Sequence, residues 1–236
     1  MLYRELAKYY DLIYSSKDYK KETARIKALV SRYKKSGGKD LLDVACGTGR
    51  HLEYLKDEFS CMGVDISKDM LEFAMRNVNG VVLKQADMTK LNLGKQFDVI
   101  TCLFSSIGYV KTYTNLRKTI QGFARHLKTG GVVLIEPWLT KSTFKEGHLG
   151  METYDGSDAK IARLCVSKIR GNFSVLDMHY LVAERGKVVT HFVDRHELGL
   201  LEIDRTLAIM KKAGFQTKFL KKGLMMDRGL FVGVKQ

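Results

Sequence analysis

The chain is poor in features that would place it in a specialised class of protein. It contains one proline and four cysteines among 236 residues, and 26 acidic residues stand against 40 lysines and arginines. No uninterrupted apolar run reaches the roughly 20 residues of a transmembrane helix, and the first residues lack the apolar segment of a signal peptide. These absences argue against a membrane-spanning, fibrous or exported chain, and we expect a globular protein of the cytoplasm.

The cysteines and histidines lack the spacing of metal ligands. The cysteines show no CxxC pair and no flanking histidines, and three of them lie in or beside apolar, strand-like runs; they are Cys46, Cys61, Cys102 and Cys165. We therefore expect buried free thiols and no metal.

The formal charge of +14 is concentrated in two stretches, residues 17–39 and 211–222. Such an excess is compatible with a solvated basic surface, with nucleic-acid binding, or with a phosphate-bearing small substrate. Neither stretch interleaves aromatic residues with its charges, as single-strand-binding surfaces do. Charge alone leaves the three interpretations open.

Strand and helix patterns alternate through most of the chain. Continuous apolar, β-branched runs such as "VITCLF" and "VVLIE" are typical of a parallel sheet covered on both faces. The expected strands are 40–45, 61–65, 81–84, 97–103, 131–136, 215–221 and 229–235, and the expected helices are 18–35, 50–57, 68–77, 113–128 and 202–213. The pattern predicts an α/β fold with a doubly wound, mostly parallel seven-stranded sheet of the Rossmann-like kind, whose ligands bind beyond the carboxyl ends of the strands.

The rhythm changes at about residue 157. Three alternating segments, separated only by Gly171-Asn172 and by residues 185–187, predict a small antiparallel meander. We expect one domain over 1–236, with an N-terminal helical cap over 1–36 and an antiparallel insert on the substrate side over 140–200. His179 and His191 of this insert are expected to have packing or surface roles, with a substrate-facing position as the alternative.

The segment "LLDVACGTGRHLEYL" joins the first predicted strand to a helix through Gly47 and Gly49. Glycines at such a joint let a ligand approach the backbone closely. A dinucleotide fingerprint would need a third glycine where Leu52 stands, and the phosphate loop ending G-K-[ST] is absent. The loop therefore does not look suited to a pyrophosphate. A plain tight turn is the alternative.

Acidic residues follow the next two strands. Asp65 stands where a carboxylate accepts hydrogen bonds from ribose hydroxyls, and Asp87 is placed to accept an adenine N–H, with Met88 beside the ring. Together with the glycine loop they describe a pocket for an adenosine without phosphates, which S-adenosylmethionine fits. The alternatives are a helix cap for Asp65, although Ser67 is the better cap, and a turn role for Asp87.

With this combination of motifs, the chain resembles the class I S-adenosylmethionine-dependent methyltransferases. It is most similar to the N,N-dimethyltransferases of nucleotide-linked 3-amino sugars, of the desosamine and mycaminose type. The resemblance spans nearly the whole chain, and the runs that carry it are "YYDLIY", "DVACGTGRHLE", "ADM", "FSSIGYVKT", "GGVVLIEPW" and "DRGLFVGV". Asp65 stands where these relatives commonly have glutamate, and position 109 is a histidine in some of them.

The resemblance implies a role for each of a set of residues. The cofactor S-adenosylmethionine would lie against Ala45, Gly47, Gly49, Asp65, Asp87, Met88, Leu103 and Tyr19, with Leu103 beneath the sulfur and Tyr19 closing over it. The acceptor would meet Tyr14, Tyr109, Trp138, Arg163 and Arg228, with the two tyrosines as the catalytic residues that orient the amine. The alternatives are a core position for Trp138, solvated positions for the arginines and structural roles for the tyrosines.

Methyl transfer from a sulfonium neutralises charge, so it requires an aligned, unprotonated nucleophile and no metal or covalent intermediate. We therefore expect no indispensable general base, and N-methylation of a small amine such as a nucleotide-linked amino sugar. The alternatives are an RNA or rRNA methyltransferase, methylation of a small non-sugar amine or acid, and a non-catalytic S-adenosylmethionine-binding protein. Nucleic acid is a weaker candidate partner than a small molecule, because the N-P-P-Y-like run of exocyclic-adenine enzymes is replaced by Phe104-Ser105-Ser106. The sequence is also compatible with a homodimer.

Overall fold

The computed structural model describes residues 2–225 and 228–236, with side chains from residue 7 onward. The helices are α1 (Leu2–Ile13), α2 (Tyr19–Tyr33), α3 (Arg50–Leu55), α4 (Lys68–Asn77), α5 (Tyr113–His126) and α6 (Ile203–Lys212), with short 3₁₀ turns η1 (Met88–Lys90) and η2 (Ser106–Val110). The strands of the larger sheet are β1 (Asp40–Val44), β2 (Ser60–Asp65), β3 (Val82–Gln85), β4 (Phe97–Cys102), β5 (Leu127–Ile135), β10 (Phe215–Leu220) and β11 (Leu230–Lys235). The smaller sheet contains β6 (Leu149–Asp155), β7 (Ala159–Arg170), β8 (Phe173–Glu184) and β9 (Thr190–Gly199).

The larger sheet has seven strands, as the sequence predicted, and their order is β10-β11-β5-β4-β1-β2-β3. β1 to β5 run parallel, whereas β11 is antiparallel to both of its neighbours. The strand order reverses between β1 and β4, and at such a switch point the loops beyond the strand ends diverge and leave room for a ligand. The glycine loop follows β1, so the topology places it at this position.

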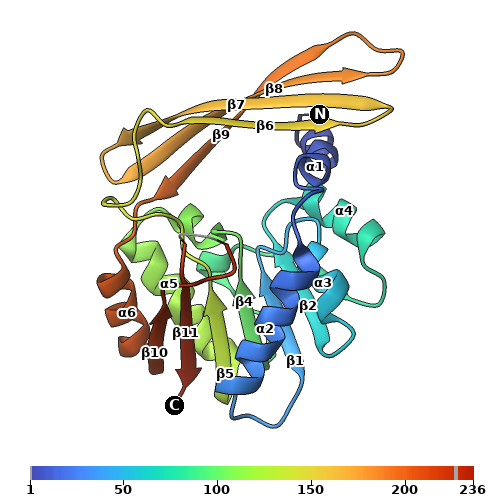
Figure 1. The fold of residues 1–236 in the computed structure, drawn as a ribbon. Helices are drawn as coiled ribbons and strands as arrows, with labels where there is room; N and C mark the ends of the chain where they lie inside the picture. The colour runs from blue at the N-terminus through green and yellow to red at the C-terminus, as the bar shows by residue number, and fades with distance from the viewer. Residues whose placement is uncertain (1, 226–227) are drawn as a thin grey trace.

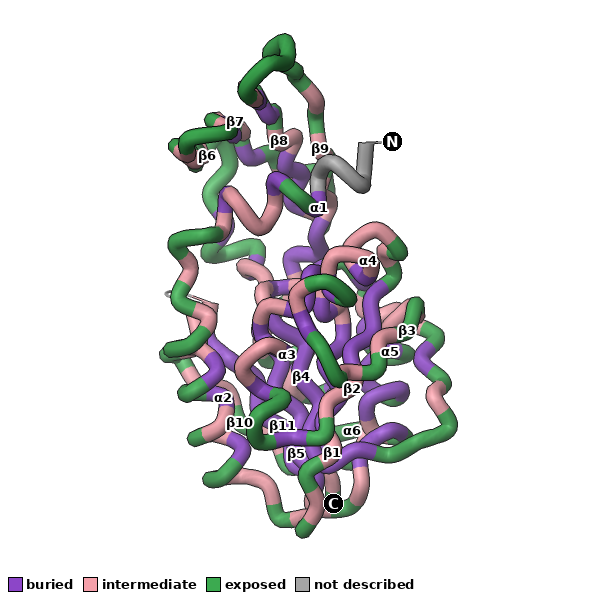
Figure 2. The backbone as a smooth tube through the Cα atoms, turned by 90° about the vertical axis from the view of Figure 1, so that its right-hand side faces the viewer, coloured by how far each residue is buried: buried purple, intermediate pink, exposed green. Residues whose placement is uncertain are grey.

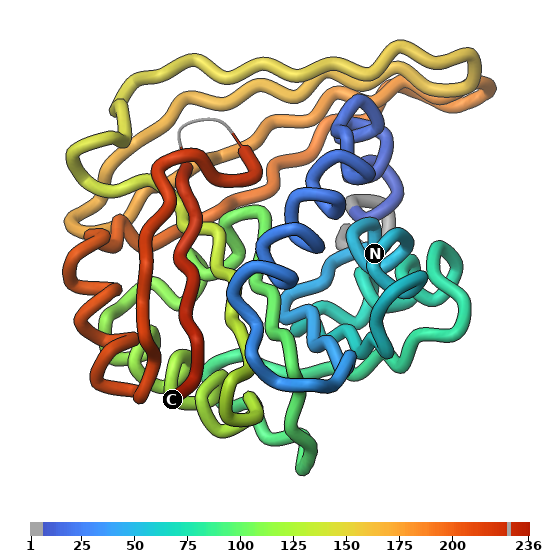
Figure 3. The backbone as a smooth tube through the Cα atoms, turned by 60° about the horizontal axis from the view of Figure 1, so that its bottom comes forward, coloured from blue at the N-terminus to red at the C-terminus, as the bar shows by residue number. Residues whose placement is uncertain are grey.

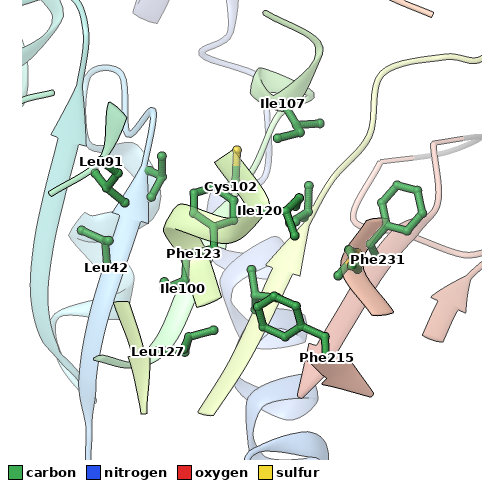
Figure 4. Close-up of a cluster of buried hydrophobic side chains, with 14 of the residues drawn as sticks. Leu42, Leu91, Ile100, Cys102, Ile107, Ile120, Phe123, Leu127, Phe215 and Phe231 are labelled. Atoms are coloured by element: carbon green, nitrogen blue, oxygen red, sulfur yellow. The ribbon is translucent and has the colours of Figure 1, made fainter. Parts of the chain in front are cut away.

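Helices cover both faces of the larger sheet (Figure 1). Residues of α5 and α6 pack on one face, where Ile120 and Phe123 approach Ile100 of β4 (Figure 4). Residues of α2, α3 and α4 pack on the other face, and Ile26 is fully buried there. Because successive strand residues point to opposite faces, a strand covered on both sides has to be apolar throughout, which explains runs such as "VITCLF".

One predicted boundary is wrong. The helix expected to reach residue 128 ends at His126, and β5 begins at Leu127 instead of 131. The register between β4 and β5 shifts at Phe97/Val99, opposite Gly130 and Gly131. Gly130, at a φ of 76°, accepts a hydrogen bond from the Lys35 N–H at 2.8 Å. This bulge lets β5 continue through Gly130 and Gly131. The sequence pattern alone indicates a break at these two glycines.

The smaller sheet is a four-stranded antiparallel meander, β6-β7-β8-β9, that lies across the carboxyl ends of the larger sheet (Figure 1). β6 was not predicted as a strand, because most of its side chains are exposed and it shows no apolar alternation. Figure 2 shows that exposed residues gather at the hairpin ends of this sheet and buried ones in the larger sheet. The meander therefore stands over the edge at which the ligand loops of the larger sheet emerge.

The N-terminal segment forms two helices, not one. α1 lies under one end of the smaller sheet (Figure 3), where Tyr9 and Ile13 pack against Ile161 and Tyr180. α2 begins at the N-cap Asp18, whose side chain accepts a hydrogen bond from the Lys21 N–H. Residues 14–18 between the helices thus pass between the two sheets. Among the described residues, no helix is long and apolar enough to cross a membrane.

Candidate active site

The glycine loop between β1 and α3 turns through residues with positive φ: Ala45 at 58°, Gly47 at 55° and Gly49 at 79°. A Cβ atom on Gly49 would lie 2.8 Å from Cγ2 of Val78, so this glycine lets the loop pack against the end of α4. A Cβ atom on Gly47 would meet no atom within 4 Å. Gly49 therefore allows close packing within the protein, whereas the open space beside Gly47 lets a ligand reach the main chain.

Asp65, the last residue of β2, connects the loop to the start of α4. One carboxylate oxygen accepts the Gly47 N–H and the other the Ser67 N–H, each at 2.8 Å. The side chain is almost buried, and burial raises its pKa. It is not the helix cap, because the Ser67 hydroxyl accepts the Met70 N–H. Each oxygen keeps a further lone pair, which suits the hydroxyls of a ribose.

Asp87 and Met88 follow β3 at the same edge of the sheet. One oxygen of Asp87 accepts both the N–H and the hydroxyl of Thr89, each at 2.8 Å, and so caps η1. Both residues are half-buried, and Met88 packs against the core under α5. The turn role considered for Asp87 is therefore present, and its second oxygen remains available to a ligand.

Tyr19, the first residue of α2, lies above the helix that follows the glycine loop. Its ring meets the ring of His51 edge-on, with centroids 5.0 Å apart. Glu22 accepts a hydrogen bond from Nε2 of His51 at 2.8 Å and another from Lys17. Burial acts to raise the pKa of Glu22, but these two hydrogen bonds bring it below its usual range. The four side chains hold α2 over α3.

Asp11 was missed by the sequence interpretation, although it lies in the quoted run "YYDLIY". It accepts the Thr48 hydroxyl at 2.6 Å and the Asn77 amide at 3.0 Å. Asn77 also donates to the Thr48 carbonyl at 3.0 Å. One carboxylate thus binds α1 to both the glycine loop and α4.

The carboxyl end of β4 makes a sharp turn beneath the smaller sheet. Leu103 is 3% exposed, and the next two residues, Phe104 and Ser105, have φ values of 51° and 63°. Buried Glu136 accepts the Phe104 N–H at 2.7 Å and the Met225 N–H at 3.0 Å. Burial raises the pKa of Glu136. This residue of "EPW" was also missed; it connects the β4 turn to the loop that precedes β11.

Arg163 of β7 points toward the larger sheet and is only 5% exposed. It donates to the hydroxyls of Tyr14 at 3.0 Å and Tyr180 at 3.3 Å, and it pairs with Glu152 at 2.8 Å. The Tyr14 ring in turn meets Phe104 edge-on at a centroid distance of 5.0 Å. The solvated position considered for Arg163 is therefore wrong, since this side chain fixes Tyr14 above the β4 turn.

Trp138 and Arg228 form a second pair beneath the smaller sheet. The Arg228 guanidinium lies 4.2 Å from the Trp138 ring centroid and donates to the Ser105 hydroxyl at 2.6 Å. The Trp138 indole N–H donates to Ser174 of β8 at 2.8 Å. Burial lowers the pKa of Arg228, and no carboxylate in the described ranges pairs with it. A largely buried guanidinium without a carboxylate partner suits an anionic ligand.

Tyr109 of η2 contacts the smaller sheet from below. Its hydroxyl lies 2.5 Å from Nδ1 of His196, and Nε2 of His196 lies 2.7 Å from the carboxylate of Asp194. Tyr109 remains 47% exposed. Neither Asp194 nor His196 was among the residues picked from the sequence, because their pairing with Tyr109 depends on the packing of β9 over η2.

His179 and His191 lie on the opposite, outward face of the smaller sheet. Their rings stack with a nitrogen–nitrogen distance of 3.1 Å, and both residues are exposed. His179 pairs across the strands with Leu164, whereas the adjacent Arg163 faces inward. The substrate-facing alternative for these histidines is therefore wrong.

The site can hold a small cationic ligand against bare backbone. Within the described ranges no three His, Cys, Asp or Glu side chains are grouped as metal ligands, and all four cysteines are free thiols. The open backbone at Gly47 and the carboxylate of Asp65 fit an adenosyl sulfonium, whose ribose needs acceptors and whose positive charge favours a nearby anion. The guanidiniums of Arg163 and Arg228 lie between the smaller sheet and the β4 turn.

Comparison with known proteins agrees with this arrangement. A family model described as "Methyltransferase domain" matches residues 41–131. The dTDP-3-amino-3,4,6-trideoxy-alpha-D-glucopyranose N,N-dimethyltransferase of Streptomyces venezuelae is 39% identical over 95% of both chains. The crystal structure of Streptomyces venezuelae DesVI superposes with a TM-score of 0.91 at 38% identity, covering 96% of this chain and 97% of the other. The SAM-bound amino pentose methyltransferase CalS10 of Micromonospora echinaspora gives 0.84 at 28% identity, covering 93% and 92%.

Proposed function

Because the chain belongs to the S-adenosylmethionine-dependent methyltransferases, in the family of the amino-sugar N,N-dimethyltransferases, we propose that it methylates the amino nitrogen of a nucleotide-linked amino sugar. The proposal is carried by one observation: the likeness to dTDP-amino-sugar enzymes extends through the smaller sheet, which supplies the buried Arg163. That sheet, not the shared glycine loop, covers the acceptor side.

S-adenosylmethionine is the cofactor, and when bound it supplies an electrophilic methyl group on a sulfonium. Its methionine end would lie along Ala45, Gly47 and Gly49, and the Asp65 carboxylate would accept the ribose hydroxyls. Asp87 and Met88 would receive the adenine, because the second oxygen of Asp87 is available. Leu103 would lie beneath the sulfur and Tyr19 above it.

The acceptor would lie between the β4 turn and the smaller sheet. Arg228 and Arg163 suit the diphosphate, and the Trp138 face suits the base or sugar. Tyr14 accepts a hydrogen bond from Arg163, which fixes its ring above the β4 turn. Tyr14 and Tyr109 would orient the amine, and alignment of this kind contributes several kcal/mol to such reactions.

The test is direct methyl transfer. The purified protein is incubated with S-adenosylmethionine and either a dTDP-linked 3-amino-dideoxyglucose or bulk RNA, and products are followed by mass spectrometry. We expect mono- and dimethylated sugar and no methylated RNA. Methylation of RNA alone would replace the proposal, and calorimetric binding of S-adenosylmethionine without transfer to either would support a non-catalytic binding protein.

We also propose that two copies of the chain associate through the outward face of the smaller sheet. Its four strands present one cross-strand row, Met151–Leu164–His179–Val193, in which the first two residues are 69% and 45% exposed. A two-fold axis would set this row against the same row of a second copy, as in an isologous dimer. Leu164→Asp should convert the dimer to monomer in sedimentation velocity; a wild-type protein that sediments as a monomer would refute this.

We also propose that the protein is located in the cytoplasm. Four free thiols without a disulfide among the described residues are typical of a reducing compartment. Cell fractionation with an antibody to the chain would test this, and recovery in the exported fraction would contradict it.

A further inference from the structure

Asp194, His196 and Tyr109 form a continuous hydrogen-bonded row that ends at the acceptor side. Asp194 and His196 alternate on β9, so their side chains share the face that looks toward the larger sheet, together with the buried Leu198. η2, which carries Tyr109, follows the β4 turn directly. The nitrogen–oxygen distances of 2.5 and 2.7 Å make both contacts hydrogen bonds.

With His196 neutral, the chemistry of the three groups sets the direction of each hydrogen bond. An ionised carboxylate only accepts, so the Nε2 atom of His196 carries the proton that Asp194 receives. In the neutral imidazole, Nδ1 then holds a lone pair and no proton. The Tyr109 hydroxyl therefore donates to Nδ1, and its oxygen presents only lone pairs to its remaining neighbours.

We propose that Asp194 and His196 are positioning residues that make Tyr109 a hydrogen-bond acceptor toward the substrate amine. The inference rests on the proposed amine acceptor. A nucleophilic amine has to keep its lone pair directed at the methyl group, so it tolerates a partner that accepts from its N–H. A partner that donated to the lone pair would block the attack. The orientation of one phenolic proton thus decides whether Tyr109 helps or hinders.

The charged groups around this row have other partners. Lys111, directly after η2, is paired with Glu197 on β9, and Arg195 pairs with Asp177 on β8. Tyr14, between α1 and α2, accepts a hydrogen bond from Arg163 at 3.0 Å. Asp194 is therefore the one carboxylate within the described residues that pairs with His196.

The experiment is a double-mutant cycle on steady-state methylation of the dTDP-amino sugar. In Asp194→Asn, the amide N–H donates to Nε2, the imidazole proton moves to Nδ1, and the Tyr109 O–H turns toward the amine. We expect kcat to fall about tenfold or more while KM for the sugar changes less than about threefold. Tyr109→Phe alone should cost less, because it removes an acceptor without adding a wrong donor.

The double variant gives the decisive readout. Asp194→Asn with Tyr109→Phe should return kcat to the level of Tyr109→Phe, above that of Asp194→Asn alone. A double variant slower than Asp194→Asn, or an Asp194→Asn enzyme equal to wild type, would overturn the proposal. Asp177→Asn, which removes a carboxylate at the outward face, is the matched control and should leave kcat unchanged.

Two further measurements keep the outcomes separable. Where Asp194→Asn fails to fold, His196→Phe replaces it: the loss of kcat should occur with Tyr109 and vanish in the Tyr109→Phe background, and equal losses in both would refute the row. If the wild-type protein binds S-adenosylmethionine but leaves the sugar unmethylated, the proposed function fails. This outcome is distinct from a failure of the Asp194–His196–Tyr109 proposal, which is judged from the variants alone.

Discussion

Replacing Asp65 with alanine tests the donor site most directly, because this carboxylate has two separable tasks. In the protein without ligand it accepts the N–H groups of Gly47 and Ser67, both at 2.8 Å. With the cofactor bound, we expect it also to accept the ribose hydroxyls. Asp65→Ala removes both sets of contacts, so stability and affinity should fall together but by amounts that can be measured apart.

The expected magnitudes follow from the two sets of contacts. Hydrogen bonds to a charged group contribute about 1.5–3 kcal/mol each, and water reaches part of the loop once the side chain is removed, so the unliganded protein should lose roughly 2–4 kcal/mol of unfolding free energy. The dissociation constant for S-adenosylmethionine should rise about tenfold or more, since a lost ribose contact of about 1.4 kcal/mol corresponds to a factor of ten.

Urea denaturation of the unliganded protein gives the first quantity and titration calorimetry the second. Asp65→Glu should retain the affinity, because it keeps a carboxylate at the end of β2. Asp57→Ala, which removes an exposed carboxylate just after α3, controls for the change of net charge. A folded Asp65→Ala protein with an unchanged dissociation constant would show that the ribose binds elsewhere.

Three further predictions use the same assays. Gly47→Ala and Gly49→Ala should both lower the unfolding free energy, because each glycine has a positive φ. The loss should be larger for Gly49→Ala, by about 1–3 kcal/mol, through the Val78 contact, whereas only Gly47→Ala should markedly weaken S-adenosylmethionine binding, because its Cβ enters the open side of the loop; equal effects of both would contradict the distinction. Arg228→Ala should raise KM for the sugar about tenfold and leave the calorimetric affinity for the cofactor intact; a matched loss of both would remove Arg228 from the acceptor side. Asp43 is 2% exposed, and burial raises its pKa to about 6. A carboxyl group whose pKa is raised in the folded state lowers the unfolding free energy as pH rises from about 4 through 6. The unfolding free energy of Asp43→Asn, measured by urea denaturation, should therefore rise relative to that of the wild type by up to about 3 kcal/mol between pH 4 and pH 8, and a pH-independent difference would refute this.

The larger sheet could be predicted because its information is local. Strands covered on both faces have to be apolar throughout, and the glycine loop needs residues that accept positive φ, so both leave a mark in a few consecutive letters. β6 leaves no such mark, since one of its faces carries exposed residues such as Leu149 and Met151. Its strand character comes from pairing with β7, which no short stretch of sequence records.

The site residues divide in the same way. Asp65 and Asp87 could be found because each follows a predicted strand, and strand ends meet at one edge of a parallel sheet. Asp11, Glu136 and His196 could not, because each acts on a partner far along the chain and belongs to no spacing pattern. For the first two, the quoted runs that contain them were the only signal.

Glu136 has a consequence for how the two halves of the site can change. One oxygen holds the turn that bears Leu103 in place and the other holds the loop leading to Arg228. The two segments thus share one carboxylate. A substitution of Glu136 should therefore disturb both the β4 turn and the segment around Met225, whereas substitutions on the inward face of the smaller sheet leave these two hydrogen bonds in place.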